Sequence, residues 1–171
     1  MDTLRSENLA MKIKYVSALM DMCVRFGQTS EAKRLQVGCL IVKNNSIISM
    51  GVNGQPPGWF SEECEDDYGN TRSTVRHAED AALQKLYLST ETSEGATMFI
   101  SHAPCLSCSL KIVAAKIDKV YYKYDYRSLE GLDFLKARGV EVEKFEEENK
   151  ECSCVEPYLR CNAHDNEQNC C

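Results

Sequence analysis

Residues 96–122 read ATMFISHAPCLSCSLKIVAAKIDKVYY and contain a strand, a helix and a second strand in direct succession. Apolar, aromatic and β-branched residues fill Ala96 to Ile100 and Lys119 to Tyr122, which predicts two strands. Cys105 to Ala115 is predicted to be a helix, and Pro104 suits its start because proline has no N–H to leave unpaired. A helix that connects two strands favours a sheet with helices packed on its faces.

The segments on either side supply further helices and strands. Residues 9–26 place apolar side chains at helical spacing, and this helix should end near Gly27. Asn44-Asn45 separate two β-rich runs, where asparagine tolerates the positive φ of a tight hairpin turn. We therefore expect an α/β fold, whose remaining elements are helices at Leu9–Phe26, His77–Leu88 and Leu129–Ala137, and strands at Val37–Val42, Ile47–Val52 and Val140–Phe145.

The overall composition limits the classes of partner. The 171 residues are enough for one domain with its own core. A net charge of −6 argues against a protein that grips long nucleic acid by its phosphates, although a local basic pocket could still hold a small anion. No apolar run approaches the roughly 18 residues of a membrane span, and Met1 to Glu7 is polar. We expect no membrane segment, no signal peptide and a location in the cytoplasm.

The ten cysteines are unevenly placed, which argues against a disulfide framework. Cys23 and Cys39 lie in apolar surroundings and are predicted to be small core residues. The composition changes after Phe145, and residues 152–171 hold five cysteines among polar side chains. We therefore place one domain over residues 1–148 and a Cys-rich tail over residues 149–171, which we expect to be disordered on its own.

Two short motifs supply metal-ligand side chains: His77-Ala78-Glu79 and Pro104-Cys105-Leu106-Ser107-Cys108. A catalytic zinc keeps three protein ligands and a fourth position for water, and His77, Cys105 and Cys108 would fill the three. Both sulfurs can face the same way at the start of a helix, where the helix dipole favours thiolates. Glu79 is left free to move protons to and from a water whose pKa zinc lowers. Together the motifs match the H-x-E and P-C-x-x-C signature of the zinc-dependent nucleobase deaminases.

Other interpretations of these cysteines stay open. The Cys-x-x-Cys pair could be a redox pair, or half of a structural zinc site with Cys64 or His102 as the fourth ligand. A purely structural zinc has no use for the carboxylate of Glu79 at that spacing. In the tail, a second metal site could use Cys152, Cys154, Cys161 and His164.

Six segments fit one known family: RLQVGCLIV at Arg34–Val42, Gly51-Val52-Asn53-Gly54 with Pro57-Gly58, VRHAE at Val75–Glu79, EGATMF at Glu94–Phe99, Pro104–Cys108 and YDYR at Tyr124–Arg127. On these residues the chain resembles the deoxycytidylate (dCMP) deaminases, particularly those of tailed phages, within the cytidine-deaminase-like superfamily. The resemblance covers roughly residues 15–145. It implies a three-layer α/β/α fold around a central five-stranded mixed sheet, with the zinc site between the two motif helices.

The resemblance also implies a role for each part of the site. His77, Cys105 and Cys108 bind one catalytic Zn²⁺ per chain, and Glu79 shuttles protons. The implied substrate contacts are Asn53 to the deoxyribose, the backbone at Ala78 and Ala103 to the polar edge of the base, Tyr126 to the ring, and Arg34 or Arg127 to the phosphate, with Lys33 as a third candidate. From the residues alone, Asn53 could equally be a turn residue, and each cation a solvated surface charge.

The implied reaction is the hydrolysis of dCMP to dUMP and ammonia, which supplies dUMP for thymidylate synthesis. One alternative is a bifunctional dCTP/dCMP deaminase. A tRNA or single-stranded-DNA deaminase would need a basic groove with stacking aromatics, and this chain is acidic with a single tryptophan. A further alternative is a non-catalytic zinc-binding module.

The resemblance bears on regulation and assembly as well. Family members respond to dCTP and dTTP through the Gly-x-Asn-Gly segment, where Val52 stands in place of the usual tyrosine and leaves regulation open. The acidic stretch Glu62–Asp67 could help to hold Mg²⁺ with an effector nucleotide, or could be a solvated loop. Family precedent implies a homo-oligomer, often a hexamer, in the host cytoplasm if the protein is phage-encoded.

Overall fold

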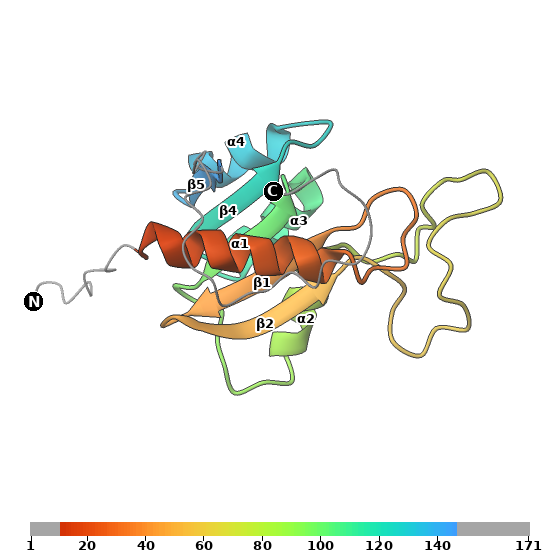
Figure 1. Cartoon of the computed structure of the whole chain (residues 1–171), viewed down its shortest axis with the longest axis horizontal. Coiled ribbons are helices and arrows are strands. Elements are labelled where there is room, and N and C mark those ends of the chain that lie inside the picture. The colour runs from red at the N-terminus through yellow and green to blue at the C-terminus, as the bar shows by residue number, and fades with distance from the viewer. Residues whose placement is uncertain (1–10, 147–171) are drawn as a thin grey trace, which may run out of the picture.

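The computed structural model describes residues 11–146, which form four helices and five strands (Figure 1). Each element that the sequence predicted is present, with ends that differ by a few residues. The Cys-rich tail at 149–171 and its possible metal site lie outside the described residues. The helices are α1 (Ile13–Gly27), α2 (Ala78–Leu86), α3 (Leu106–Ala114) and α4 (Glu130–Ala137), and the strands are β1 (Gly38–Lys43), β2 (Ser46–Val52), β3 (Thr97–His102), β4 (Lys119–Tyr124) and β5 (Glu141–Lys144).

The five strands form one mixed sheet in the order β2-β1-β3-β4-β5. Strand β1 pairs antiparallel with β2 and β3, whereas β3, β4 and β5 run parallel. The β1–β2 hairpin turns through Asn44 and Asn45, whose φ angles are 50° and 60°, as the sequence predicted. Parallel neighbours need crossover connections, and α3 and α4 provide them. The expected five-stranded mixed sheet is confirmed.

Alternating side chains of the central strands face two different helical layers. Leu40 and Phe99 pack with residues of α1 in one core cluster. Ile41 and Ile100 point the other way, into a cluster with residues of α2, α3 and α4. In Figure 1, α1 lies alone across the near face of the sheet. This alternation follows from the two-residue repeat of a strand and produces the expected three-layer α/β/α architecture.

Two glycines allow helices to approach their neighbours closely. A Cβ on Gly51 of β2 would lie 2.5 Å from the backbone nitrogen of Ala82, and closer still to the carbonyl oxygen of Ala78. A Cβ on Gly131 of α4 would lie 2.7 Å from Ser109 Oγ, and closer still to the carbonyl oxygen of Pro104. Helices α2 and α3 carry the two sequence motifs. These contacts therefore set how closely α2 packs on β2 and how closely the start of α3 packs on α4.

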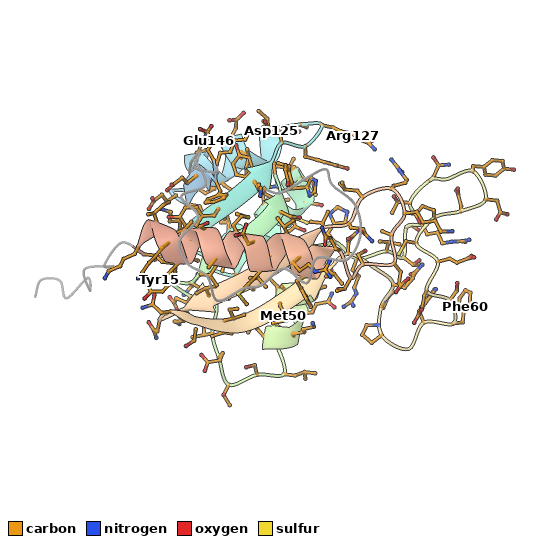
Figure 2. All side chains as sticks on the ribbon, in the orientation of Figure 1. Tyr15, Met50, Phe60, Asp125, Arg127 and Glu146 are labelled. Carbon is orange, nitrogen blue, oxygen red and sulfur yellow. The ribbon has the colours of Figure 1, made fainter. Side chains whose placement is uncertain are left out.

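The long segment between β2 and α2 extends away from the sheet, as Figure 1 and the label of Phe60 in Figure 2 show. An isolated bridge between Gly54 and Arg76 joins the two ends of the segment, and a second bridge, between Glu65 and Thr71, lies within it. The carboxylate of Asp66 accepts hydrogen bonds from the backbone N–H groups of Tyr68 (2.9 Å) and Asn70 (2.8 Å). The long segment therefore contains a short hairpin with its own internal hydrogen bonds, and the acidic stretch Glu62–Asp67 forms part of it.

Cys23 and Cys39 have no exposed surface, which confirms the prediction that they are core residues. Burial raises the pKa of Cys23 to about 12 and the pKa of Cys39 well above its usual value, so both remain thiols. Within residues 11–146, no helix has the length and apolar character needed to cross a membrane.

Candidate active site

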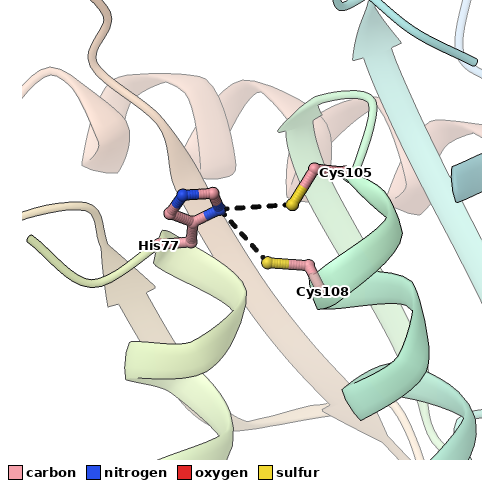
Figure 3. Close-up of side chains that lie close together, drawn as sticks. All are labelled: His77, Cys105 and Cys108. Carbon is pink, nitrogen blue, oxygen red and sulfur yellow. Dashed lines mark hydrogen bonds between the residues drawn. The ribbon is translucent and has the colours of Figure 1, made fainter. Parts of the chain in front are cut away.

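The two sequence motifs meet at the N-termini of α2 and α3. His77 is the N-cap of α2 and Cys105 is the N-cap of α3, both with extended backbone angles, and Cys108 lies in the first turn of α3. Sequence analysis predicted helices that begin at His77 and Cys105, whereas each helix begins one residue later. Figure 3 shows the His77 ring pointing at the two sulfurs from the opposite helix. Both helix N-termini carry a partial positive charge, which favours thiolates here.

The distances among these side chains fit a tetrahedral zinc. Nδ1 of His77 lies 3.5 Å from Sγ of Cys105 and 3.3 Å from Sγ of Cys108, and all three ligand atoms lie within 4.8 Å of one another. Zinc bond lengths of about 2.0 Å to nitrogen and 2.3 Å to sulfur put tetrahedral ligands about 3.5 Å apart. The donor set therefore fits Zn²⁺ with one position left for another ligand.

Neither residue considered as a fourth protein ligand joins this group in the described part of the chain. Sγ of Cys64 donates to the carbonyl oxygen of Glu62 in the long loop. His102 hydrogen-bonds through Nδ1 to Ser101 Oγ at 3.0 Å, and that hydroxyl accepts the backbone N–H of Gly38. A three-ligand site is the arrangement of a catalytic zinc and differs from the closed four-ligand arrangement of a structural one.

Hydrogen bonds among the side chains of His77, Cys105 and Cys108 shift the pKa values of all three. The hydrogen bond from the Cys108 thiol, followed by the bond from His77, lowers the pKa of Cys105 to about 3. The same bond to Cys105 raises the pKa of Cys108, and the Cys105 thiolate raises the pKa of His77. A divalent metal ion would take the place of the shared protons, since thiolates and neutral imidazole are its ligands.

Glu79 lies in the first turn of α2, and only 4% of its surface is exposed. Burial is the largest influence on the pKa of its carboxyl group and raises it. A carboxyl group with a raised pKa exchanges its proton more readily near neutral pH, which is the property of a general acid–base residue.

A cavity of about 590 Å³ opens beside the cluster and brings the candidate residues together. Nine of the ten site residues predicted from the sequence line it, and the tenth, Cys108, is buried and does not. Nine further residues of the wall were given no substrate role by sequence analysis, among them the polar residues Glu65, Thr71, His102 and Asp125. The nine predicted residues of the wall are Arg34, Asn53, His77, Ala78, Glu79, Ala103, Cys105, Tyr126 and Arg127.

Asn53 is held firmly at the cavity wall. Its Oδ1 accepts the backbone N–H of Val37 at 2.8 Å, and its Nδ2 donates to the carbonyl oxygen of Leu35 at 2.8 Å. Its own carbonyl oxygen accepts a bond from Ser30 Oγ at 2.6 Å. An amide oxygen has two lone pairs and an amide nitrogen two hydrogens, so one of each is left for a ligand.

The candidate cations differ in their surroundings. Nη1 of Arg34 donates to Thr71 Oγ1 at 3.2 Å on the cavity wall. The guanidinium carbon of Arg127 lies 5.8 Å from the centre of the Tyr126 ring, and both residues follow β4 on the cavity side (Arg127 is labelled in Figure 2). Lys33 does not line this cavity, although it lines an adjoining depression.

Comparison with known proteins agrees with this geometry. The family model described as "Cytidine and deoxycytidylate deaminase zinc-binding region" matches residues 14–124. The crystal structure of the dCMP deaminase of cyanophage S-TIM5, in complex with dCMP and dUMP, is similar with a TM-score of 0.78 at 43% sequence identity. That similarity covers 79% of this chain and 99% of the phage chain.

Two curated relatives are similar in sequence. The deoxycytidylate deaminase of Saccharomyces cerevisiae is 31% identical over 144 residues, which are 79% of this chain but only 46% of the yeast protein. The chain thus spans about half the length of that relative. The deoxycytidylate deaminase of Mycobacterium phage D29 is 35% identical over 108 residues, which are 56% of this chain and 83% of the phage protein. The region matched by the family model contains the zinc-ligand cluster and strands β1 to β4 of the sheet, and the chain belongs to the cytidine and deoxycytidylate deaminase family of zinc-binding proteins.

Proposed function

We propose that this protein hydrolyses dCMP to dUMP and ammonia. One observation carries the proposal: a single cavity joins the buried Glu79 and the zinc-ligand cluster to the two arginines Arg34 and Arg127. Glu79 and the zinc-ligand cluster suit the deamination of a nucleobase. The arginines suit the phosphate of a nucleotide. The S-TIM5 enzyme, described in complex with dCMP and dUMP, supports the same substrate and product.

When bound by His77, Cys105 and Cys108, zinc would lower the pKa of a water, so that the water can lose a proton and attack the base near neutral pH. Glu79 accepts the proton of that water and delivers it to the ring nitrogen next to the reacting carbon. Glu79 then takes the remaining proton of the added oxygen and passes it to the amino group, which leaves as ammonia while the ring carbon becomes a carbonyl. The burial of Glu79 keeps bulk water from competing for these protons.

The remaining residues of the wall would bind and orient the nucleotide. The backbone at Ala78 and Ala103 faces the polar edge of the base, and the free hydrogen-bonding positions of Asn53 suit the hydroxyl group of the deoxyribose. Tyr126, which is half-buried, would pack against the ring. This arrangement lets the base reach Glu79 while the phosphate stays at the exposed arginines.

The phosphate-binding role is assigned to Arg34 and Arg127 and withheld from Lys33, which lies off the cavity wall. Both arginines are exposed, and among the described residues neither forms an ion pair with an acidic side chain. An unpaired guanidinium beside a cavity is available to a bidentate phosphate.

Assembly and regulation belong to the proposal as well. A homo-oligomer is supported by Tyr15 and Met22, large apolar residues of α1 that are 51% and 50% exposed (Tyr15 is labelled in Figure 2). We keep four further features as parts of the same proposal: a hexamer, control by dCTP or dTTP, Mg²⁺ bound with an effector nucleotide, and action in the host cytoplasm. Turnover of dCTP as well as dCMP is the second candidate activity.

Ammonia release tests the proposed reaction directly. The zinc-loaded protein is assayed with dCMP, dCTP and deoxycytidine, alongside Glu79→Ala. Glu94→Ala is the matched control, because that glutamate is 63% exposed, lies outside the cavity and pairs with Lys116. We expect turnover of dCMP by the wild type and the control, and none by Glu79→Ala with its zinc content unchanged. A zinc-loaded wild type that releases no ammonia from any of the three compounds would contradict the proposal and favour a polynucleotide substrate or a non-catalytic role.

A further inference from the structure

Glu65 places a negative charge in the cavity wall beside Arg34. Its Oε1 accepts hydrogen bonds from the backbone N–H groups of Lys33 (3.1 Å) and Arg34 (3.2 Å). Successive N–H groups that point at one oxygen form an arrangement by which proteins bind anions. The segment that carries the candidate phosphate-binding arginine therefore already holds an anion, and that anion belongs to the protein.

The short hairpin that carries Glu65 keeps its carboxylate in place. The backbone of Glu65 forms a bridge with Thr71, and its carbonyl oxygen accepts a bond from Arg72 Nε at 2.9 Å. The guanidinium of Arg34 donates to Thr71 on the same hairpin. Arg34, Glu65 and Thr71 all line the cavity, so the cation and the carboxylate share one wall.

The charge of Glu65 is not neutralised by a neighbouring side chain. Within residues 11–146, no lysine, arginine or histidine forms an ion pair with it. Asp125, an acidic residue elsewhere in the cavity wall, differs in this respect because Lys144 Nζ lies 2.5 Å from its Oδ2. The third acid of the wall, Glu79, is buried beside the zinc-ligand cluster. Glu65 is therefore the carboxylate whose negative charge acts on a ligand bound at Arg34.

We propose that Glu65 makes the cavity selective for nucleoside monophosphates over triphosphates. The inference rests on the proposed function, since it concerns the phosphate end of a cytosine deoxynucleotide. A monophosphate brings a charge of about −2, which Arg34 can partly offset. Each further phosphate adds negative charge beside the same fixed carboxylate, and like charges at short range repel more strongly where water is partly excluded. Glu65 is thus a specificity-determining residue that acts by repulsion.

Glu65→Gln removes the charge and retains an oxygen that can accept the two backbone hydrogen bonds. Ammonia release from the zinc-loaded protein is measured with dCMP and dCTP, each alone. We expect the ratio of kcat/KM for dCTP to that for dCMP to rise about tenfold in this variant. Glu63→Gln is the control, because Glu63 lies on the same hairpin outside the cavity wall and is 69% exposed, and it should leave the ratio unchanged.

Glu65→Ala removes the charge and both hydrogen bonds, so it should raise the ratio even if its Tm falls. A ratio that stays within about twofold of the wild-type value in both Glu65 variants would overturn the inference, and so would an equal rise in Glu63→Gln. Failure of the proposed function is a different result, namely no dCMP turnover by the wild type. In that case the equilibrium binding of dUMP and dUTP tests Glu65, and dUTP must gain affinity relative to dUMP in Glu65→Gln for the inference to stand.

Discussion

Replacing Gly131 by alanine tests the contact that seats the zinc-site helix α3 against α4. The added Cβ would lie 2.7 Å from Ser109 Oγ and 2.9 Å from the carbonyl carbon of Cys105, with the carbonyl oxygen of Pro104 closer still. Two of these three atoms belong to the backbone and cannot turn away by a change of rotamer. The substitution must therefore displace α4, the turn at Cys105, or both.

Two opposing effects decide the size of the change at Gly131. Alanine is favoured over glycine by about 1 kcal/mol in a helix interior, and this is an upper bound for Gly131, which lies in the first turn of α4. Forcing a methyl group into a close-packed site costs about 1–3 kcal/mol, and contact with rigid backbone places this case at the upper end. The clash should win, so we expect a net loss of about 1–2 kcal/mol of unfolding free energy. For a domain of this size, that corresponds to a decrease in Tm of about 2–8 °C.

Thermal unfolding of the zinc-loaded protein measures this loss, with Gly54→Ala as the matched control. A Cβ on Gly54 would meet no atom within 4 Å, so its unfolding free energy should stay within about 0.5 kcal/mol of the wild type. Competition with a chelator gives the second readout, since a shifted Cys105 should weaken zinc binding. A Tm for Gly131→Ala equal to or above the wild-type value, with unchanged zinc affinity, would show that the packing argument is wrong.

Three further predictions follow from the site. Arg34→Ala or Arg127→Ala should raise the KM for dCMP about tenfold and leave deoxycytidine turnover unchanged, because a charge-assisted phosphate contact contributes about 1.5–3 kcal/mol. An unaltered KM for dCMP in both variants would show that neither arginine binds the phosphate. In the zinc-free protein the pKa of Cys105 is lowered to about 3, so its thiolate is present above that pH. Alkylation of Cys105 by iodoacetamide should therefore be nearly as fast at pH 5 as at pH 8, as located by peptide mass spectrometry, and zinc should suppress the labelling. Asp80→Asn should cost less than about 1 kcal/mol, because its partner Lys111, 2.7 Å away, has a side chain that is 51% exposed; a larger loss of Tm in denaturation experiments would mean that this pair between α2 and α3 matters more than its exposure suggests.

Local sequence determined the order and type of the secondary structure. The turn at Asn44 and Asn45 depends on the backbone freedom of asparagine, and the runs that form β1, β3 and β4 depend on residues suited to strands. The cluster of His77, Cys105 and Cys108 could also be predicted, because the chemistry of zinc restricts both the type and the spacing of its ligands, and the structure brings the three side chains together. The helix ends were less well defined, since His77 and Cys105 cap their helices from outside.

The sequence by itself thus determined an α/β fold. It also predicted the candidate zinc ligands and the carboxylate beside them, because each of these features depends on a pattern of residues close together in the sequence. Only the tertiary structure decided which residues complete the cavity. Glu65 reaches Arg34 through the path of a long loop, and Asn53 is held by the backbone of Leu35 and Val37 on another segment. Such contacts join residues far apart in sequence, and their formation depends on how the layers pack rather than on any local propensity.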